Sequence, residues 1–359
     1  MVIEFLQFVD YFPQKYGVVM LEQFGGWSGV LSDLCEGKNL PSENTEAVLT
    51  EILSGEADPS QIAAFLVALK VKGETTEEIT GLVRAMLNAA ETLPLPEGTI
   101  DIVGTGGSSQ RREAALNVST MASFVAAAAG AVVCKHGNRK ASSTSGAFDL
   151  LDSLGLPVEQ TPKEVAEQVE KYGLGFAFAK TFHPAMRFAG PVRAGIGVPT
   201  VFNILGPLSH PGRLKRHLIG TSNLKIAGQM AEVLMANGSE RAWVVTGEDG
   251  VDEISVTGPS NIVELKNGEI SEWVLDPVDL GISYSSPDDL KGGSAEKNAQ
   301  IARQIFSGAE TGAKREMVLL NAAAALVVSG VVSDINEGLK KVADSVDTGR
   351  VTQLLDSLI

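Results

Sequence analysis

The sequence predicts an α/β protein: a small N-terminal helical domain plus a larger α/β domain with a mixed, mainly parallel central sheet covered by helices. Three observations predict this class. Apolar residues recur at helical spacing through the N-terminal part of the chain. Short β-rich runs then alternate with helical patterns. Further along, an Asn-Gly pair between two β-rich runs indicates a hairpin, so part of the sheet is expected to be antiparallel.

Composition and charge exclude several classes of protein. The chain has 359 residues, of which 44% are apolar and 20% charged, as in a packed globular protein. Its formal charge of −15 argues against a nucleic-acid partner, because such binding needs a basic face. It has no apolar run of roughly 18–20 residues, so we expect no membrane span. Its two cysteines fit a cytoplasmic location, since their spacing provides neither a disulfide framework nor a metal site.

The first elements are expected to be helices. Residues 1–25 read as an N-terminal extension to which we assign no function. Asp58 followed by Pro59 is an N-cap with proline at the first helical position, and Thr75 to Glu78 forms a capping box before a second apolar stripe. Such stripes are typical of core packing, although a helical layer could equally form a subunit interface.

The breakers at residues 94–98 mark the start of the α/β part. Beyond them, the pattern predicts strands at Ile100–Val103, Ala131–Cys134, Gly175–Ala179, His217–Gly220 and Arg241–Thr246. Helices are expected at Ser119–Ala129 and Ala322–Val328. The hairpin turn is Asn267-Gly268, between Ile262–Leu265 and Ile270–Val274.

A glycine-rich segment follows the first expected strand. Three glycines at 104, 106 and 107, directly after that strand, let the backbone turn tightly and offer N–H groups to an anion. Asn117–Thr120 opens the next helix with polar residues, so hydroxyls and the positive end of the helix dipole are expected to face the same loop. These two features together favour phosphate binding over a simple tight connection.

A cationic segment, Lys135–Gly146, follows the second expected strand. It combines Lys135, Arg139 and Lys140 with four successive hydroxyl residues. Ligands of open α/β sheets lie outside the carboxyl ends of the strands, so this segment and the glycine-rich one should meet at the same edge. Guanidinium, ammonium and hydroxyl donors suit a phosphorylated small molecule.

An acidic segment follows the strand Arg241–Thr246. Asp252 and Glu253 are adjacent carboxylates at this strand end, and carboxylate oxygens are ligands that Mg²⁺ prefers. Taken alone, the segment could equally be a solvated turn. Beside a polyphosphate pocket, Mg²⁺ is the better account, because it cancels the repulsion between carboxylate and phosphate.

Together these segments resemble anthranilate phosphoribosyltransferases, which carry the motifs Gly-Thr-Gly-Gly, Asn-Val-Ser-Thr, Lys-His-Gly-Asn-Arg and Val-Asp-Glu in this order. The resemblance extends to Phe182–Arg187 and to Val192-Arg193 followed by Gly197–Leu208. It covers roughly residues 26 to 359, nearly the whole chain.

The resemblance implies a nucleoside-phosphorylase-like fold and a reaction. The helical domain would comprise residues 26–96 and about 183–208 and would mediate a homodimer, while residues 97–182 and 209–359 would form the α/β domain. The reaction would transfer phosphoribose from phosphoribosyl pyrophosphate (PRPP) to the amino group of anthranilate, in tryptophan biosynthesis. The products would be N-(5-phosphoribosyl)anthranilate and pyrophosphate, and the enzyme would need Mg²⁺.

The same resemblance implies site residues. Magnesium would be held by Ser119, Asp252 and Glu253. Anthranilate would be received by Gly104, His136, Asn138 and Arg193, with Arg187 as a competitor for its carboxylate. His136 would either accept a proton or only position the amine. PRPP would be bound by Gly104, Thr105, Gly106, Gly107, Ser108, Asn117, Val118, Ser119, Thr120, Lys135, His136, Gly137, Asn138, Arg139, Ser142 and Ser143.

The sequence departs from the family pattern on the PRPP side. Ser108-Ser109 replaces Asp-Gly, and Ala115 and Ala147 stand where the family has Thr and Ser. Arg111 and Arg112 enter the loop, either as replacement phosphate contacts or as a solvated tip. Rival hypotheses are a related phosphoribosyltransferase or nucleoside phosphorylase with another acceptor, or an inactive ligand-binding paralogue. Phosphorylases usually carry Lys-His-Ser-Thr-Gly-Gly, which this chain lacks.

Overall fold

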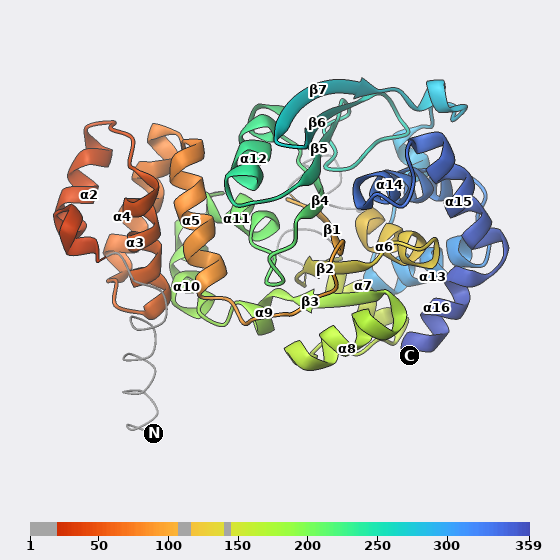
Figure 1. Ribbon diagram of the computed structural model, residues 1–359, viewed down its shortest axis with the longest axis horizontal. Helices are drawn as coiled ribbons and strands as arrows, with labels where there is room; N and C mark the ends of the chain where they lie inside the picture. The colour runs from red at the N-terminus through yellow and green to blue at the C-terminus, as the bar shows by residue number, and fades with distance from the viewer. Residues whose placement is uncertain (1–19, 107–115, 140–144) are drawn as a thin grey trace. The chain divides into compact units, whose positions relative to one another are not determined.

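The computed structural model describes residues 20–106, 116–139 and 145–359. It divides the chain into two compact units (Figure 1). One is helical, and its described residues are 20–90 and 183–209; the other contains the sheet, and its described residues are 91–106, 116–139, 145–182 and 210–359. In the described ranges, no helix is both long and apolar enough to cross a membrane.

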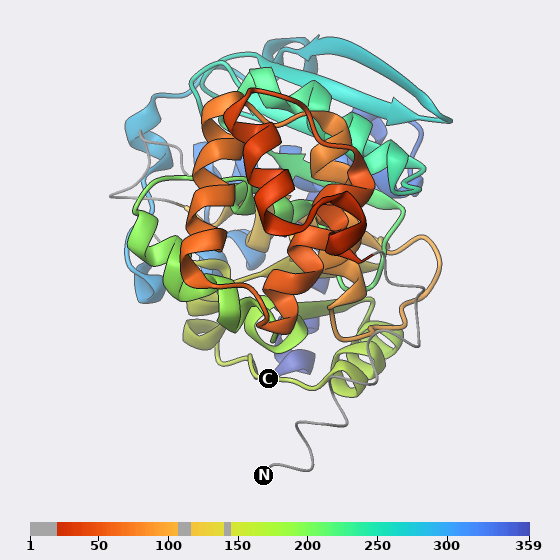
Figure 2. The ribbon, with the colours of Figure 1, turned by 90° about the vertical axis from the view of Figure 1, so that its left-hand side faces the viewer.

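The helical unit contains the helices expected from the sequence. Asp58 caps the helix that starts at Pro59, and Thr75 caps the next one through a capping box with Glu78, which confirms both predicted starts. Figure 2 faces the red and orange helices of this unit. Its elements are η1 (Leu21–Phe24), α2 (Gly26–Cys35), α3 (Ser42–Ser54), α4 (Pro59–Lys72), α5 (Thr76–Asn88), α10 (Met186–Ile196) and α11 (Phe202–Leu208).

Packing within this unit buries the apolar stripes. α3 packs against α5 and α2 against α4, while α10 contacts both α3 and α4. Phe65 and Leu66 of α4 are almost fully buried, and the Trp27 ring meets Phe65 edge-on at 6.4 Å between centroids. The buried Glu78 pairs with Lys72 at 2.9 Å, which compensates its loss of hydration.

The second unit is built on a seven-stranded sheet with the order β3-β2-β1-β4-β5-β6-β7. The first five strands in this order are parallel, whereas β6 and β7 are antiparallel, which confirms a mixed, mainly parallel sheet. Asn267 and Gly268 have positive φ angles of 54° and 78°, as a type I′ hairpin turn requires. The strands are β1 (Ile100–Gly104), β2 (Val133–Gly137), β3 (Leu174–Phe178), β4 (Arg216–Gly220), β5 (Arg241–Gly247), β6 (Ser260–Lys266) and β7 (Glu269–Leu275).

Helices cover both faces of this sheet, as expected. α6 and α14 pack on one face, where the Phe124 ring contacts Phe176 and Phe306 at 5.4 and 5.2 Å between centroids. α8 covers the opposite face at β3, and α12 packs against β5 and β6. The helices are α6 (Val118–Ala128), α7 (Ala147–Leu154), α8 (Pro162–Tyr172), α9 (Ala179–Phe182), α12 (Leu224–Ala236), η2 (Pro277–Leu280), η3 (Pro287–Leu290), α13 (Ala295–Phe306), α14 (Ala313–Ser329), α15 (Ile335–Asp347) and α16 (Arg350–Leu358).

The direction of the chain changes at β1. From β1 the chain winds outward through β2 to β3, and it then returns to add β4 on the other side of β1. Crevices at the carboxyl ends of strands next to such a switch point are where open α/β sheets bind ligands. The ends of β1 and β4 therefore locate the candidate site.

One strand extends three residues beyond its expected end. The sequence predicts that the second strand ends at Cys134, but β2 runs to Gly137. It pairs with β3 over its whole length, including Lys135 with Phe176 and His136 with Ala177. Lys135 and His136 are consequently buried strand residues, not loop residues. Sheet pairing outweighed the polar character that indicated a loop.

Candidate active site

Two glycines make room for Asp252 at the switch point. Gly104 ends β1 and pairs with Gly220, which ends β4. A Cβ at Gly104 would overlap the carboxylate of Asp252, and a Cβ at Gly220 would overlap its backbone carbonyl. The acidic segment therefore reaches the ends of β1 and β4 only because both positions lack a side chain.

Hydrogen bonds fix the acidic segment in this place. The backbone N–H of Gly106 donates to Oδ2 of Asp252 at 2.8 Å. On the other side of the carboxylates, Ile254 donates its N–H to Oδ1 of Asn321 at 3.0 Å and accepts from Nδ2 of Asn321 at 2.9 Å. Asp252 and Glu253 are thus held between the glycine-rich turn and α14.

A buried charged pair lies between β1 and β2. The ladder between these strands is limited to Ile100 with Val133, whereas β1 pairs with β4 along its full length. After this pair, the two strands are joined by side-chain hydrogen bonds in place of backbone ones. Lys135 Nζ donates to the carbonyl of Ile102 at 2.5 Å, and Oδ1 of Asp101 accepts the N–H of His136 at 3.0 Å. Both side chains are almost fully buried.

The environment shifts the pKa of each member of this pair. Burial raises the pKa of Asp101, against the lowering effect of Lys135 and of backbone N–H groups. Burial lowers the pKa of Lys135, while the carboxylates of Asp101, Glu253 and Asp252 raise it. The Lys135 amine is therefore electrostatically coupled to Asp101 and to both carboxylates of the acidic segment.

Two histidines meet edge-to-face beside this pair. The rings of His136 and His210 have centroids 5.8 Å apart. Nδ1 of His210 accepts the N–H of Gly212 at 3.0 Å, so its Nε2 carries the proton that is shared with the carbonyl of Cys134 at 2.9 Å. His210 is therefore neutral and held in one orientation, and its ring packs against the ring of His136, which is almost fully buried.

Asn117 is the residue before α6, as the expected polar helix start requires, but its side chain makes no capping hydrogen bond. Its Nδ2 donates to the carbonyl of Ser145 at 3.2 Å, and its Oδ1 accepts the Ser145 hydroxyl at 3.0 Å. Thr120 is buried, whereas Ser119 is half-buried. Of the polar residues at this helix start, Asn117 and Ser119 are the ones that are partly exposed.

Family models match both units. A model described as "Glycosyl transferase family, helical bundle domain" matches residues 28–90, and "Glycosyl transferase family, a/b domain" matches residues 97–352. The anthranilate phosphoribosyltransferase of Rubrobacter xylanophilus is 44% identical over 323 residues, which are 90% of this chain and 94% of that protein. This chain belongs to the anthranilate phosphoribosyltransferase family.

Solved structures of anthranilate phosphoribosyltransferases have the same fold. The structure from Thermus thermophilus gives a TM-score of 0.86 at 38% identity, covering 92% of this chain and 98% of that one. The structure from Saccharomyces cerevisiae, in complex with PRPP and Mg, gives 0.84 at 27% identity, covering 93% and 96%.

The family motifs of the α/β unit are distributed over three strand ends. Gly104 ends β1 and is followed by Thr105 and Gly106, and Thr105 donates its N–H to the carbonyl of Gly220 at 2.8 Å. Gly137 ends β2, and the exposed Asn138 follows it. Val118, also expected to bind PRPP, is fully buried.

Arg139, expected to bind PRPP, contacts acidic residues of α7. Its guanidinium donates to Asp152, lies 3.6 Å from Asp149 and covers the Phe178 ring at 5.9 Å. These exposed ion pairs compete with a phosphate for the same cation. The remaining expected PRPP residues, Gly107, Ser108, Ser142 and Ser143, lie outside the described residues, as do Ser109, Arg111, Arg112, Ala115 and Lys140.

Arg193, expected to bind anthranilate, belongs to the helical unit. It lies in the last turn of α10, half-buried, with its guanidinium 4.8 Å from the centroid of the Phe202 ring. Burial lowers its pKa from the ordinary arginine value. Arg187, its competitor, is exposed and donates to the carbonyl of Pro184 at 3.2 Å.

Four residues near the candidate site were not singled out by the sequence motifs: Asp101, His210, Asn298 and Asn321. The two asparagines carry a signal that could have found them. Asn298 lies on the same face of its helix as Ala302 and Ile305, and Asn321 interrupts the apolar run 317–328. A polar side chain on a buried helix face needs a partner, which makes it a candidate for a structural or site contact.

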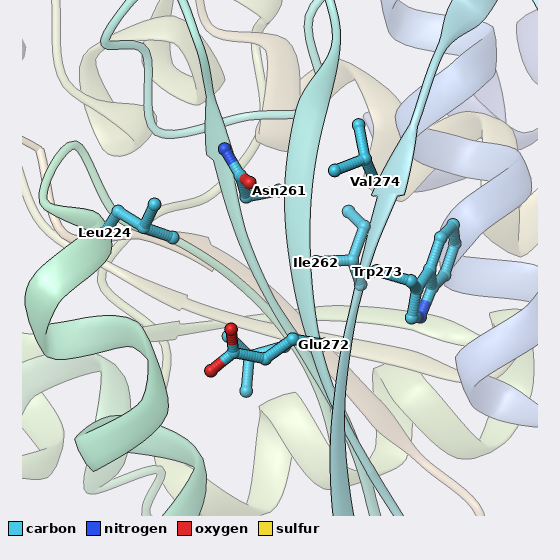
Figure 3. A pocket seen from close by; sticks show the side chains of 7 residues that line it. Leu224, Asn261, Ile262, Glu272, Trp273 and Val274 are labelled. Carbon is cyan, nitrogen blue, oxygen red and sulfur yellow. The ribbon is translucent and has the colours of Figure 1, made fainter.

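A hollow elsewhere in the α/β unit is unconnected with these residues. It has a volume of about 160 Å³ and lies on β6, β7 and the start of α12, where Leu224, Glu272 and Val274 line it (Figure 3). It shares no residue with the ends of β1, β2 and β4. We assign it no part in the family's chemistry.

Proposed function

We infer that this chain catalyses the reaction of its family, transfer of a phosphoribosyl group from PRPP to the amino group of anthranilate, which releases pyrophosphate. The observation that carries this inference is 44% identity to an anthranilate phosphoribosyltransferase over 90% of the chain. The direct test follows the loss of anthranilate fluorescence after PRPP and Mg²⁺ are added. An inactive paralogue would leave the fluorescence unchanged, and another acceptor would be consumed in place of anthranilate.

We propose that the residues at the strand ends meet two requirements of this reaction. Departure of pyrophosphate leaves an oxocarbenium-like ribose, so the enzyme must stabilise the leaving charge and place the amine behind the anomeric carbon. We propose that Lys135 and the glycine-rich segment that begins at Gly104 contact the phosphates. Asn117 and Ser119, at the start of α6, would complete this side. No covalent nucleophile is needed.

We propose that Asp252, Glu253 and Ser119 hold Mg²⁺ in this chain. In the described residues, no three acidic, histidine or cysteine side chains gather into a metal-binding group. Two carboxylates and a hydroxyl fit an ion that completes its coordination with water and substrate phosphates. The close approach of Asp252 to Gly104 and Gly220, which a Cβ at either position would prevent, supports this assignment. When bound, the ion would neutralise developing charge on pyrophosphate.

We expect Asp252→Asn with Glu253→Gln to abolish the magnesium dependence of PRPP binding and to reduce turnover by about 100-fold or more, the scale of lost transition-state charge stabilisation. Calorimetric titration of PRPP at several Mg²⁺ concentrations measures the first effect. The matched control, Asp288→Asn with Asp289→Asn, neutralises another adjacent acidic pair of the same unit, which is exposed, and should leave both properties unchanged. Full wild-type activity in the presence of a chelator would contradict the metal assignment.

On the acceptor side we propose Arg193 as the partner of the anthranilate carboxylate, because a guanidinium binds a carboxylate bidentately. His136, Asn138 and Gly104 would contact the rest of the acceptor. His136 would orient the amine or take its proton as the new bond forms. Its contact with His210 supports a fixed ring orientation in either case.

We further propose a homodimer through the helical unit. Ala64, Val67 and Val71 lie at spacings of three and four on the outer face of α4, where Val67 is 44% and Val71 83% exposed. An exposed apolar stripe of this kind is typical of an interface between subunits. We also propose a cytoplasmic location, because both cysteines are free thiols and Cys35 is exposed.

A further inference from the structure

We propose that Asn298 is a positioning residue that sets the orientation of the Asn117 amide for PRPP. Asn298 lies on α13, which packs against α7, and its side chain is fully buried. Its Nδ2 donates to Oδ1 of Asn117 at 2.7 Å, across 181 positions of the chain. This inference rests on the proposed function, in which Asn117 contacts PRPP.

The orientation of the Asn298 amide is determined by a backbone group. Oδ1 of Asn298 accepts the N–H of Gly293 at 2.9 Å. A backbone N–H can only donate, so the oxygen of Asn298 must face Gly293 and its NH₂ group must face Asn117. The opposite orientation would bring two donors together at one end and two acceptors at the other.

The same logic then determines the orientation of Asn117. Because Asn298 presents a donor, Asn117 must present its oxygen, and that oxygen also accepts the hydroxyl of Ser145. Its NH₂ group consequently turns to the other side, where one hydrogen goes to the carbonyl of Ser145. The second hydrogen of this group is a donor, which is the polarity that a phosphate or ribose oxygen needs.

Asn298 therefore acts on the substrate through Asn117. Its side chain lies on the buried face of α13, together with Ala302 and Ile305. An amide is costly in such a setting unless it is hydrogen-bonded. The two hydrogen bonds to Gly293 and Asn117 compensate this cost and join α13 to the start of α6.

A double-mutant cycle on the full-length enzyme tests the proposal. The dissociation constant of PRPP is measured by calorimetry with saturating Mg²⁺ for wild type, Asn117→Ala, Asn298→Ala and the double variant. Loss of a hydrogen-bonded substrate contact should raise this constant about 10-fold for Asn117→Ala, and about 5-fold or more for Asn298→Ala. In the Asn117→Ala background, Asn298→Ala should change the dissociation constant of PRPP by less than about 2-fold, because the Asn117 amide through which Asn298 acts is already absent.

A second variant covers the case in which Asn298→Ala does not fold. Asn298→Asp keeps the acceptor for Gly293 but cannot donate to Asn117, so the Asn117 amide should rotate and present its oxygen to PRPP. We expect weaker PRPP binding by about 10-fold or more, with the KM for anthranilate changed by less than about 2-fold. Asn237→Asp makes the same chemical change at the end of α12, where Asn237 donates to the carbonyl of Val233, and should leave PRPP binding unchanged.

The possible failures are distinguishable. A wild-type enzyme that does not bind PRPP would refute the proposed function itself. Wild-type binding by Asn117→Ala would refute the role of Asn117, and the positioning role of Asn298 with it. Additive losses in the double variant, or equal losses for PRPP and anthranilate, would show that Asn298 is only structural.

Discussion

At the scale of single residues, Arg193 illustrates how a charge can be prepared for a ligand. Its guanidinium is half-buried over the Phe202 ring, and burial lowers its pKa, so removal from water is a cost that an anionic partner would offset. The aromatic ring holds the guanidinium through a cation–π contact without using its hydrogen-bond donors. These donors are what a bidentate carboxylate requires.

We therefore expect Arg193→Ala to raise the KM for anthranilate by about 100-fold or more, since loss of one partner of a desolvated charge pair costs a few kcal/mol. The KM for PRPP should change much less. Steady-state kinetics with each substrate varied in turn provide the measurement, and Arg187→Ala is the matched control. If Arg187→Ala instead gave the selective effect, the carboxylate contact would belong to Arg187.

The site residues divide by how they could be predicted from the sequence. Gly104, Lys135 and Asp252 stand in motifs whose residue types already indicate phosphate and metal chemistry. Asp101 and Asn298 do not, because their roles depend on partners in distant segments: the N–H of His136 and the amide of Asn117. A single sequence shows a polar residue in an apolar pattern, but it does not show which group will satisfy it.

At the scale of elements, local signals predicted most of the fold. The caps at Asp58 and Thr75 and the Asn267-Gly268 hairpin are confirmed, because each depends on backbone groups within a few residues. The predicted end of β2 was wrong. Lys135 and His136 are stabilised by pairing with β3 and by contacts with β1, and both strands are remote from them in sequence. The family and its activity, inferred from motif order, are confirmed by the relatives.

The strand ends of β1 and β4 yield a prediction at this scale. A Cβ at Gly220 would overlap the carbonyl of Asp252, and a backbone atom cannot move aside as a flexible side chain can. We expect Gly220→Ala to displace the acidic segment and to reduce turnover by about 10-fold or more, with a loss of about 1–3 kcal/mol in the free energy of unfolding from overpacking.

Gly258→Ala is the matched control for this variant. It lies in the connection between β5 and β6, as Asp252 does, but a Cβ there would meet nothing within 4 Å. Turnover and denaturant unfolding should both match the wild type. Wild-type turnover by Gly220→Ala would mean that the close approach of Asp252 to β4 is not needed for activity.

At the scale of the whole molecule, the residues of the proposed site come from both units. The proposed phosphate and metal residues belong to the α/β unit, whereas Arg193, the proposed carboxylate contact, belongs to the helical unit. The chain crosses from one unit to the other at Ala90, Phe182 and Ser209, so the helical unit is assembled from two segments that are remote in sequence. Association of a second copy through α4 would add to the stability of this small unit, because it would remove exposed apolar area from water.

The proposed dimer can be tested by placing charges on α4. Val67→Glu with Val71→Glu places two charges on the exposed stripe of α4. In an isologous interface these charges would lie close to the same charges on the second subunit. We expect wild type to sediment as a dimer and the double variant as a monomer, or with a dimer dissociation constant raised by about 100-fold or more, since buried unpaired charge costs several kcal/mol. Helicity should persist, because glutamate favours helix more than valine and both positions are exposed. Val278→Glu, at a position 51% exposed in the α/β unit, controls for the added charge and should remain dimeric. A monomeric wild type, or a double variant that still dimerises with wild-type affinity, would show that the stripe on α4 has another role.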